Sequence, residues 1–187
     1  MEIHETHDNA AAMEYAAGCL SRGHEGLDVF YNETTFLQTG VLETSDVAAA
    51  QAMGIPVWQA EHMGGSIVCF PGDLSLCLTT WGGSDFGERL FAATAEYLRG
   101  KGVEVTTDNN DVLVNGRKVM SWARGTTREG WCQTVAHYSV HIDLDIIRQI
   151  CTKDMEKTPG ALSTYNITAD ELFEDVVLPC INEEDGL

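Results

Sequence analysis

The sequence is poor in positive charge. Only 11 of its 187 residues are lysine or arginine, against 29 aspartates and glutamates, so the formal net charge is −18 at pH 7. A surface of this sign repels the phosphate backbone of nucleic acids and the headgroups of anionic membranes. The composition therefore argues against a general nucleic-acid-binding protein and against a protein held on a membrane surface.

The chain also lacks the marks of export and membrane insertion. No apolar run approaches the roughly 18–20 residues that a spanning helix needs, and the first residues are acidic where a signal peptide is basic and then apolar. Six cysteines are spread along the chain without a Cys-x-x-Cys pair, which fits neither a zinc site nor a dense disulfide framework. We expect an intracellular, cytoplasmic protein with reduced thiols and no signal peptide.

Motifs of several large enzyme classes are missing as well. The sequence has no Gly-x-Ser-x-Gly, no Walker loop, no Rossmann glycine fingerprint and no His-Glu-x-x-His. What it does have is 44% hydrophobic residues in a length that suits a single globular domain. We expect one ordered domain.

Hydrophobic periodicity and capping residues predict an α+β fold. The expected helices are 8–22, 46–53 with Ser45 as the cap, 84–100, 143–151 and 169–177. The expected strands are 27–31, 36–42, 55–59, 66–70, 74–80, the hairpin 111–120 and 131–142. Together they predict a mostly antiparallel or mixed β-sheet flanked by helices.

The strongest local signal is the hairpin. Asn115-Gly116 lies between two β runs, and this dipeptide favours a two-residue type I′ turn. A regular hairpin pairs residue 114 with 117, 113 with 118, 112 with 119 and 111 with 120. Asp111 and Lys118 then become diagonal neighbours, roughly 7–8 Å apart at the backbone, within reach of one ligand or a metal-bound phosphate. The alternative is that Lys118 is a solvated charge.

Positive charge is concentrated around this hairpin in the sequence. Residues 99–128 hold six bases and three acids, a local net charge of +3 in a strongly acidic chain. Such a stretch would focus an anion at the candidate site. The alternative is that the bases protect an edge strand from aggregation.

The histidines give a weaker signal. His137 and His141 are four residues apart, but their neighbours favour a strand, in which two imidazoles about 13 Å apart cannot share a metal ion. His4, His7 and His24 lie in the polar N-terminal part and are expected in solvent.

Around the hairpin the sequence resembles the biotin and lipoate protein ligases and the octanoyltransferases. Asn110-Asp111, the Asn115-Gly116-Arg117 turn and Lys118 are similar to that family's strand, turn and catalytic lysine. The order of segments agrees, since 9–14 resembles the first helix, 29–31 the next strand, 54–68 a strand and glycine-rich loop, and 141–144 a strand-to-helix junction. The resemblance implies a class II synthetase-like catalytic domain over 1–187, with its core at about 9–165 and a short C-terminal helix and tail at 166–187.

The resemblance also implies a chemistry. The domain would bind an acyl cofactor such as lipoate, octanoate or biotin, or its adenylate, and transfer it to a lysine of an acyl-carrier or lipoyl domain. Lys118 would polarise the acyl carbonyl. In the ATP-using ligases, Asp111 would help to hold the nucleotide through Mg²⁺. The residues that would bind substrate or cofactor are Gly64, Gly65, Ser66, Asn110 and Asp111.

A second catalytic residue comes from the octanoyltransferases. They use no ATP and form a thioester on a cysteine beside the lysine, near the place of Cys151 in this chain. The family's cysteine stands in a Pro-Cys-Gly context, whereas Cys151 stands between isoleucine and threonine. The alternative is a buried apolar role for Cys151 beside Ile147.

Two further positions depart from the family. Its glycine-rich loop has an arginine before the glycines and a histidine after them, where this chain has Met63, or His62 in a shifted register, and Phe70. Each lost charged hydrogen bond costs about 1.5–3 kcal/mol. Two hypotheses therefore stay open: an active ligase or acyltransferase, and a catalytically degenerate member that serves as a binding or structural component of an oligomer or larger assembly, for example a virus particle.

Overall fold

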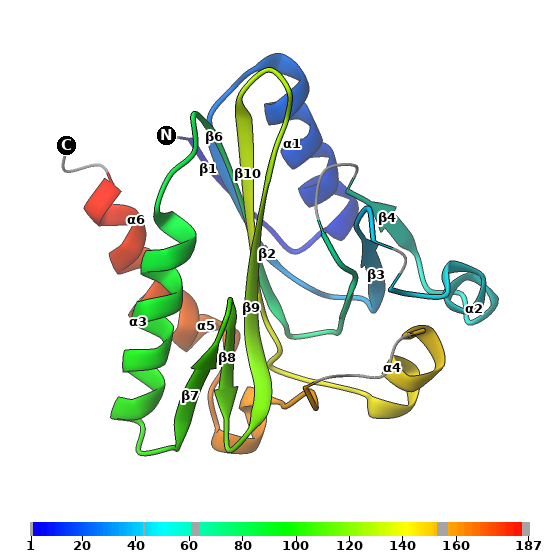
Figure 1. Cartoon of the computed structure of the whole chain (residues 1–187), viewed down its shortest axis with the longest axis vertical. Coiled ribbons are helices and arrows are strands. Elements are labelled where there is room, and N and C mark those ends of the chain that lie inside the picture. Colours follow the sequence, from blue (N-terminus) through cyan, green and yellow to red (C-terminus); the bar gives the residue numbers. More distant parts are fainter. Residues whose placement is uncertain (1, 43, 61–63, 153–156, 185–187) are drawn as a thin grey trace.

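The computed structural model describes residues 2–42, 44–60, 64–152 and 157–184, which form two sheets with helices on both sides (Figure 1). The large sheet has seven strands, and all neighbours are antiparallel except the parallel pair β1 and β2. Its strands in spatial order are β1 (Glu2–Thr6), β2 (Gly26–Tyr31), β6 (Leu74–Trp81), β10 (Trp131–Tyr138), β9 (Arg117–Thr126), β8 (Asp111–Val114) and β7 (Val105–Asp108). The predicted α+β class with a mixed, mostly antiparallel sheet is confirmed.

A small sheet lies beside the large one. It has the order β4 (Val57–Gln59), β3 (Phe36–Thr39) and β5 (Ile67–Cys69), with β3 parallel to β4 and antiparallel to β5. Helices α2 (Val47–Ala52) and α4 (Leu144–Ile150) pack against each other next to it. Leu37, Ala50, Ile55 and Ile150 form a separate buried cluster there.

The two faces of the large sheet differ in chemistry. One face is covered by α3 (Phe86–Gly100) and by the C-terminal helices α5 (Ala169–Leu172) and α6 (Leu178–Glu184), which a π-helical segment at Phe173–Val177 joins (Figure 1). This side holds the main hydrophobic core. The C-terminal helices contribute five buried residues to it, and the loop before them contributes Ile167, so the core extends beyond the expected limit at 165: Leu172, Val176, Val177, Cys180 and Ile181.

The other face is covered by α1 (Asn9–Arg22) and the small sheet (Figure 1). Because side chains alternate along a strand, the residues between the core leucines of β6 point to this face. Several of the side chains here are polar and buried, as in Asp28, Ser75, Thr79, Gln133 and His137. Buried polar side chains of this kind are more typical of a ligand-binding face than of a hydrophobic core.

Local signals placed most helices correctly. Asp8 caps α1 by accepting from the backbone N–H groups of the first turn, and Gly23 ends it with φ +62°. Helix α3 also lies where the periodicity predicted it. The expected cap Ser45 is wrong, because the side chain of Asp46 accepts the N–H of Ala49 and caps α2.

Several strand predictions need correction. The strand expected over 36–42 ends at Thr39. The strand expected over 131–142 ends at Tyr138, because the N–H groups of Val140 and His141 donate to the buried carboxylate of Asp73 instead of a neighbouring strand. Strand β1 was not predicted, since its five residues contain a single large apolar side chain and it pairs along the edge of the sheet.

Within the described residues, no helix has both the length and the apolar character that crossing a bilayer requires.

Candidate functional site

The predicted hairpin is present, with one irregularity. Asn115 and Gly116 have φ of 49° and 73°, the positive values that a type I′ turn needs. Residue 114 pairs with 117 and 113 with 118, as predicted. A β-bulge follows, so that 112 pairs with 120 and 111 with 121, and the predicted pairs of 112 with 119 and 111 with 120 are wrong.

The bulge decides which side chains share a face. In a regular strand, Lys118 and Ser121 are three residues apart and point to opposite faces. The extra residue places both on the face of Asp111, because 118 pairs with Leu113 and 121 pairs with Asp111. The backbone of Lys118 is also held from outside the hairpin, by bonds from its N–H to Thr158 O (2.9 Å) and from Gly160 N–H to its carbonyl (2.7 Å).

Lys118 and Asp111 form an ion pair, with 3.9 Å between Nζ and Oδ1. Their side chains are 37% and 15% exposed, so the ammonium keeps access to a ligand while the carboxylate is largely covered. The predicted juxtaposition of this acid and this amine is therefore present.

A third charged residue was missed. Lys157 places Nζ 2.7 Å from Asp111 Oδ2 and 2.9 Å from Asp108 Oδ2. Burial lowers its pKa, but the hydrogen bonds to the two carboxylates outweigh burial and the net shift is upward. Lys157 is 46 residues from Asp111 in sequence, and no local pattern marks it.

Two adjoining cavities meet at Lys118. The first, here named the lysine cavity, has about 270 Å³ and includes Cys151, Lys157 and Ile147. The second, named the inter-sheet cavity, has about 200 Å³ and includes Gly64, Gly65, Asn110, Gln38 and His137. Ser66, Ile67, Asp111, Lys118 and Ser121 line both. All seven residues singled out from the sequence thus come together: Gly64, Gly65, Ser66, Asn110, Asp111, Lys118 and Cys151.

The glycine-rich segment is tied to the loop after β3. Thr44 Oγ1 accepts the N–H of Ser66 at 2.9 Å and donates to its hydroxyl at 3.0 Å. Among the described residues, a Cβ added at Gly64 would meet nothing within 4 Å, and one at Gly65 would meet only Thr44 Oγ1 at 3.7 Å. Packing does not require glycine here, so the space beside the backbone is open to a ligand.

Cys151 lies directly after α4, half-buried in the lysine cavity. Burial raises the pKa of its thiol, and the nearby ammonium of Lys118 lowers it by a smaller amount. The net shift is upward, which favours the thiol over the nucleophilic thiolate.

The sequence departs from the family at one position before the glycine-rich loop and one after it, and the structure describes only the second. Met63 and the alternative His62 lie outside the described residues. Phe70 is only 5% exposed, lines neither cavity and donates its backbone N–H to Asp73 Oδ2 at 2.8 Å. Residue 70 therefore supplies no polar side chain to the site.

His137 lies in β10, as predicted, and is fully enclosed. Its Nδ1 is 2.9 Å from Ser75 Oγ, and its Nε2 is 3.3 Å from Asp73 Oδ2. Burial opposes a charge on the ring, but contacts with Cys69 and Asp73 outweigh it and raise the pKa of His137 to about 10.

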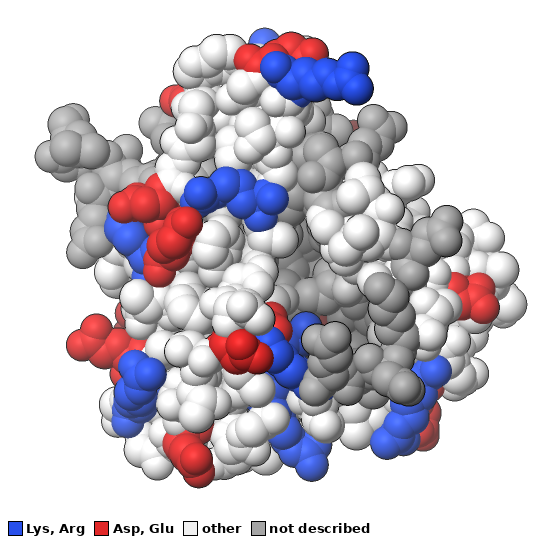
Figure 2. Space-filling model, viewed as in Figure 1, with Lys and Arg blue, Asp and Glu red and all other residues white. Residues whose placement is uncertain are grey.

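The bases of residues 99–128 do not form one patch. Lys101 pairs with Glu171 and Arg124 with Glu88, on different elements. Figure 2 shows the lysines and arginines of the visible face standing apart, most of them beside acidic residues. The stretch that is basic in sequence is thus dispersed in space, and three of its six bases, Lys101, Lys118 and Arg124, form ion pairs with described acidic residues.

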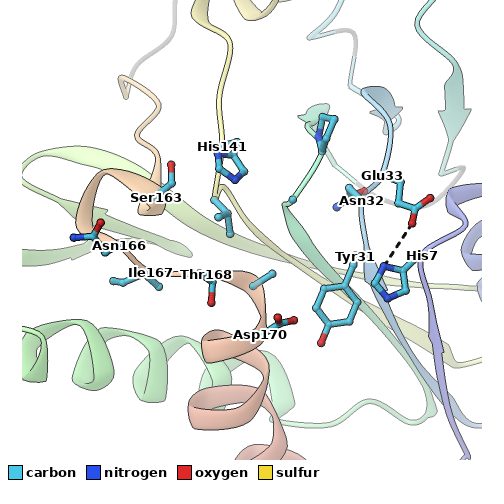
Figure 3. Close-up of a pocket in the computed structure, with 14 residues that line it drawn as sticks. His7, Tyr31, Asn32, Glu33, His141, Ser163, Asn166, Ile167, Thr168 and Asp170 are labelled. Atoms are coloured by element: carbon cyan, nitrogen blue, oxygen red, sulfur yellow. Dashed lines mark ion pairs between the residues drawn. The ribbon is translucent and has the colours of Figure 1, made fainter.

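A larger cleft of about 870 Å³ lies on the other side of residues 139–142 (Figure 3). His7, Tyr31, His141 and Asp170 line it, and His7 faces Glu33 at 3.8 Å and stacks on Tyr31. The side chain of His7 is 62% exposed, so its expected position in solvent is confirmed even though it lies at the rim of this cleft. None of the residues predicted for catalysis or binding lines this cleft.

By sequence, no protein-family model and no curated protein matches the chain. Solved structures do match. Ta0514, a putative lipoate protein ligase from T. acidophilum with bound lipoic acid, has a TM-score of 0.72 at 16% identity over 95% of this chain and 82% of that one. A bipartite lipoate protein ligase, described with its E2 lipoyl domain from Thermoplasma acidophilum, has a TM-score of 0.70 at 18% identity over 95% and 82%.

The likeness extends more weakly to biotin enzymes. The biotin protein ligase from Aquifex aeolicus in complex with biotin and ATP has a TM-score of 0.51 at 10% identity, over 84% of this chain and 59% of that one. The resemblance read from the hairpin thus holds for the three-dimensional structure, and the chain has the fold of the catalytic domain shared by the lipoate and biotin protein ligases.

Proposed function

We propose that this domain binds an acyl cofactor of the lipoate, octanoate or biotin type, or its adenylate, and transfers the acyl group to a lysine of an acceptor protein. The observation that carries the proposal is the partly exposed ammonium of Lys118, held by Asp111 where two cavities meet. The fold supports it, since the neighbours include a structure with lipoic acid and one with biotin and ATP.

Lys118 acts on the acyl carbonyl. The amine nitrogen of the acceptor lysine attacks the acyl carbon, and the carbonyl electron pair moves to the oxygen. The ammonium of Lys118 hydrogen-bonds this oxyanion as its charge develops. The electron pair then returns, the amide forms, AMP leaves from the acyl adenylate, and the proton of the attacking amine passes to solvent. Because the carboxylate of Asp111 faces Nζ, it orients the ammonium.

Lys157 affects the role of Asp111. A magnesium ion at this carboxylate would have to displace an ammonium that lies 2.7 Å away and also pairs with Asp108. In the proposed reaction Asp111 is therefore the ion-pair partner of two lysines. Lys157 balances its charge, so that Lys118 is not drawn fully onto Asp111 and remains available to the acyl oxygen.

The adenylate route fits the site better than the thioester route. A thioester requires Cys151 as a thiolate, and burial shifts the pKa of this thiol upward despite Lys118. Transfer from an adenylate needs no cysteine. Cys151→Ser should therefore retain transfer with ATP and a free acid as the donor, whereas loss of transfer would favour the thioester route.

The proposal is tested by weighing an acceptor. The protein is incubated with ATP, Mg²⁺, a lipoyl-domain acceptor and lipoate, octanoate or biotin, and separately with an octanoyl-carrier donor, and the intact mass of the acceptor is measured. We expect the mass of one acyl group, and a 10²–10³-fold slower gain with Lys118→Ala, about the cost of one lost oxyanion donor.

Lys101→Ala is the matched control, because Lys101 is a partly exposed lysine that pairs with Glu171 on the opposite face of the sheet. Its transfer rate should equal that of the wild type. No adduct with any donor, together with no binding of any of the acids by calorimetry, would overturn the proposal and favour the degenerate, structural role.

A further inference from the structure

The small sheet ends at β4, whose outer edge is unpaired among the described residues. Just before β4, the carbonyl of Pro56 accepts the N–H of Leu37 on β3 at 2.9 Å. Backbone groups along a parallel strand alternate in direction, so those of residues 56, 58 and 60 face β3 and those of Val57 and Gln59 face away. Within the described chain, the N–H groups of Val57 and Gln59 donate to no other backbone group.

A groove of about 670 Å³, here named the β4 groove, lies between this strand and helix α1. Figure 1 shows the two elements next to each other. The helix contributes Ala10, Met13 and Ala17, which share one face at helical spacing, and the strand contributes Trp58. Ala10 and Ala17 are exposed, and Met13 and Trp58 are half-buried. The groove therefore offers apolar surface beside the open edge.

The charge of the groove has one sign. The carboxylates of Asp8, Glu14 and Glu33 line it, and no lysine or arginine of the described chain does. His7, also in the wall, lies 3.8 Å from Glu33. A second copy of this chain would bring another net charge of −18 and be repelled. Charge complementarity therefore favours a partner with lysine or arginine at this place.

The edge of the large sheet shows how an exposed strand is kept from pairing. Strand β1 carries Glu2, His4 and Glu5 among its five residues, and charged side chains on an edge discourage the addition of another strand. Strand β4 has no ionisable side chain. An uncharged edge next to an apolar groove suits recognition of an extended peptide, in which the backbone gives affinity and alternate side chains give specificity.

We propose that an extended segment of a partner protein, with apolar residues at alternate positions and a lysine or arginine at each end, adds to the small sheet as a fourth strand at β4. Its backbone pairs with Val57 and Gln59, its apolar side chains pack in the β4 groove against α1, and its cations face Glu14 and Glu33. The inference is independent of the proposed function, because the β4 groove shares no lining residue with the lysine cavity or the inter-sheet cavity.

The first test uses the wild-type protein without any peptide. Amide hydrogen exchange is followed by heteronuclear NMR of the isotope-labelled protein. The amides of Val57 and Gln59 should exchange at least about tenfold faster than that of Trp58, whose N–H faces β3. Protection of Val57 and Gln59 equal to that of Trp58 would show that the edge is already paired, and would overturn the inference.

The second test adds the peptide Lys-Thr-Leu-Thr-Val-Thr-Lys as the probe. Its lysines, leucine and valine share one face of an extended chain. We expect its addition to slow exchange at Val57 and Gln59 and to shift the NMR signals of these residues and of the α1 face from Ala10 to Ala17. The peptide Glu-Thr-Leu-Thr-Val-Thr-Glu has the same apolar residues and should bind at least about tenfold more weakly.

Two variants at one position separate backbone pairing from side-chain contact. Gln59→Pro removes a donor that faces away from β3, so the small sheet keeps its own bonds and the lysine peptide should bind about tenfold more weakly. Gln59→Ala keeps this donor and should bind the peptide as the wild type does.

Three results with the peptides would overturn the inference. They are no binding of the lysine peptide, equal binding of the peptide with glutamate ends, and signal shifts that leave β4 and α1 unchanged. Unchanged binding by a folded Gln59→Pro protein would overturn it as well. The comparison of the two peptides needs only the wild type, so it remains decisive if a variant misfolds. None of these results affects the proposed acyl transfer, which is measured separately.

Discussion

At the scale of single residues, the polar face of the large sheet contains a buried carboxyl group, that of Asp28, with a partner among the described residues for only one of its two oxygens. Asp28 is fully buried on β2, and its Oδ1 lies 2.6 Å from His4 Nδ1 on the edge strand β1. Its second oxygen has no hydrogen-bond partner among the described residues. Burial raises the pKa of Asp28 to about 6, although the contact with His4 lowers it.

This shift predicts how stability depends on pH. The folded protein holds a proton on Asp28 up to about pH 6, whereas the unfolded chain releases it near 3.8, so the stability of the wild type falls as the pH rises between these values. Asp28→Asn has no proton to lose. Relative to the wild type, it should gain about 3 kcal/mol of unfolding free energy between pH 4 and 7, as measured by urea denaturation.

Asp145→Asn is the control for this experiment, because its carboxylate is 84% exposed and should leave the pH dependence unchanged. A difference between Asp28→Asn and wild type that stays constant over this pH range would contradict the assignment.

At the scale of elements, the hairpin of β8 and β9 positions the site. Its turn brings the chain back so that 113 pairs with 118, and its bulge turns Ser121 to the same face as Lys118. Segment 158–160 adds a further pairing to the backbone of Lys118 and brings Lys157 to Asp111. The lysine is therefore held by contacts on both sides of its strand.

The turn itself can be tested with two glycines. Gly116 has φ +73° with no atom within 4 Å of an added Cβ, whereas Gly100 ends helix α3 without a positive φ and is equally open. We expect Gly116→Ala to lose about 1 kcal/mol of unfolding free energy, because a Cβ strains the left-handed backbone. Gly100→Ala should be neutral or slightly stabilising. Equal effects of the two substitutions in urea denaturation would show that the turn conformation is not what glycine supplies.

At the scale of the whole molecule, the last helices belong to the main core. Val176, in the π-helical segment, is 1% exposed and packs in the same cluster as the strands of the large sheet. Leu178, two residues later, is 37% exposed. The C-terminal residues therefore close the face of the sheet opposite the site.

These two residues give a matched test of that role. Val176→Asp buries an unpaired carboxylate and should cost about 4 kcal/mol or prevent folding, as followed by circular dichroism and thermal unfolding. Leu178→Asp adds the same charge at the surface and should cost less than about 1 kcal/mol. A folded Val176→Asp protein with the wild-type melting temperature would show that these helices do not hold the core together.

The parts that were predictable depend on short-range chemistry. Three correct predictions each involve residues only a few positions apart: the cap Asp8, the periodicity of α3 and the Asn115-Gly116 turn. The turn also brings Asp111 near Lys118. The resemblance pointed to the segments that the fold then gathers around Lys118. The prediction of the register past residue 113 was wrong because nothing in the sequence marks the bulge.

The sequence by itself thus determined the α+β class, the hairpin and the acid and amine beside its turn, because local backbone preferences and side-chain alternation act within one element. Only the tertiary structure decided that Lys157 pairs with Asp111, that Cys151 lies in the same cavity as Lys118, and that Gln38 and His137 line the inter-sheet cavity beside them. These contacts join segments tens of residues apart, and they are set by how the two sheets and α4 pack together.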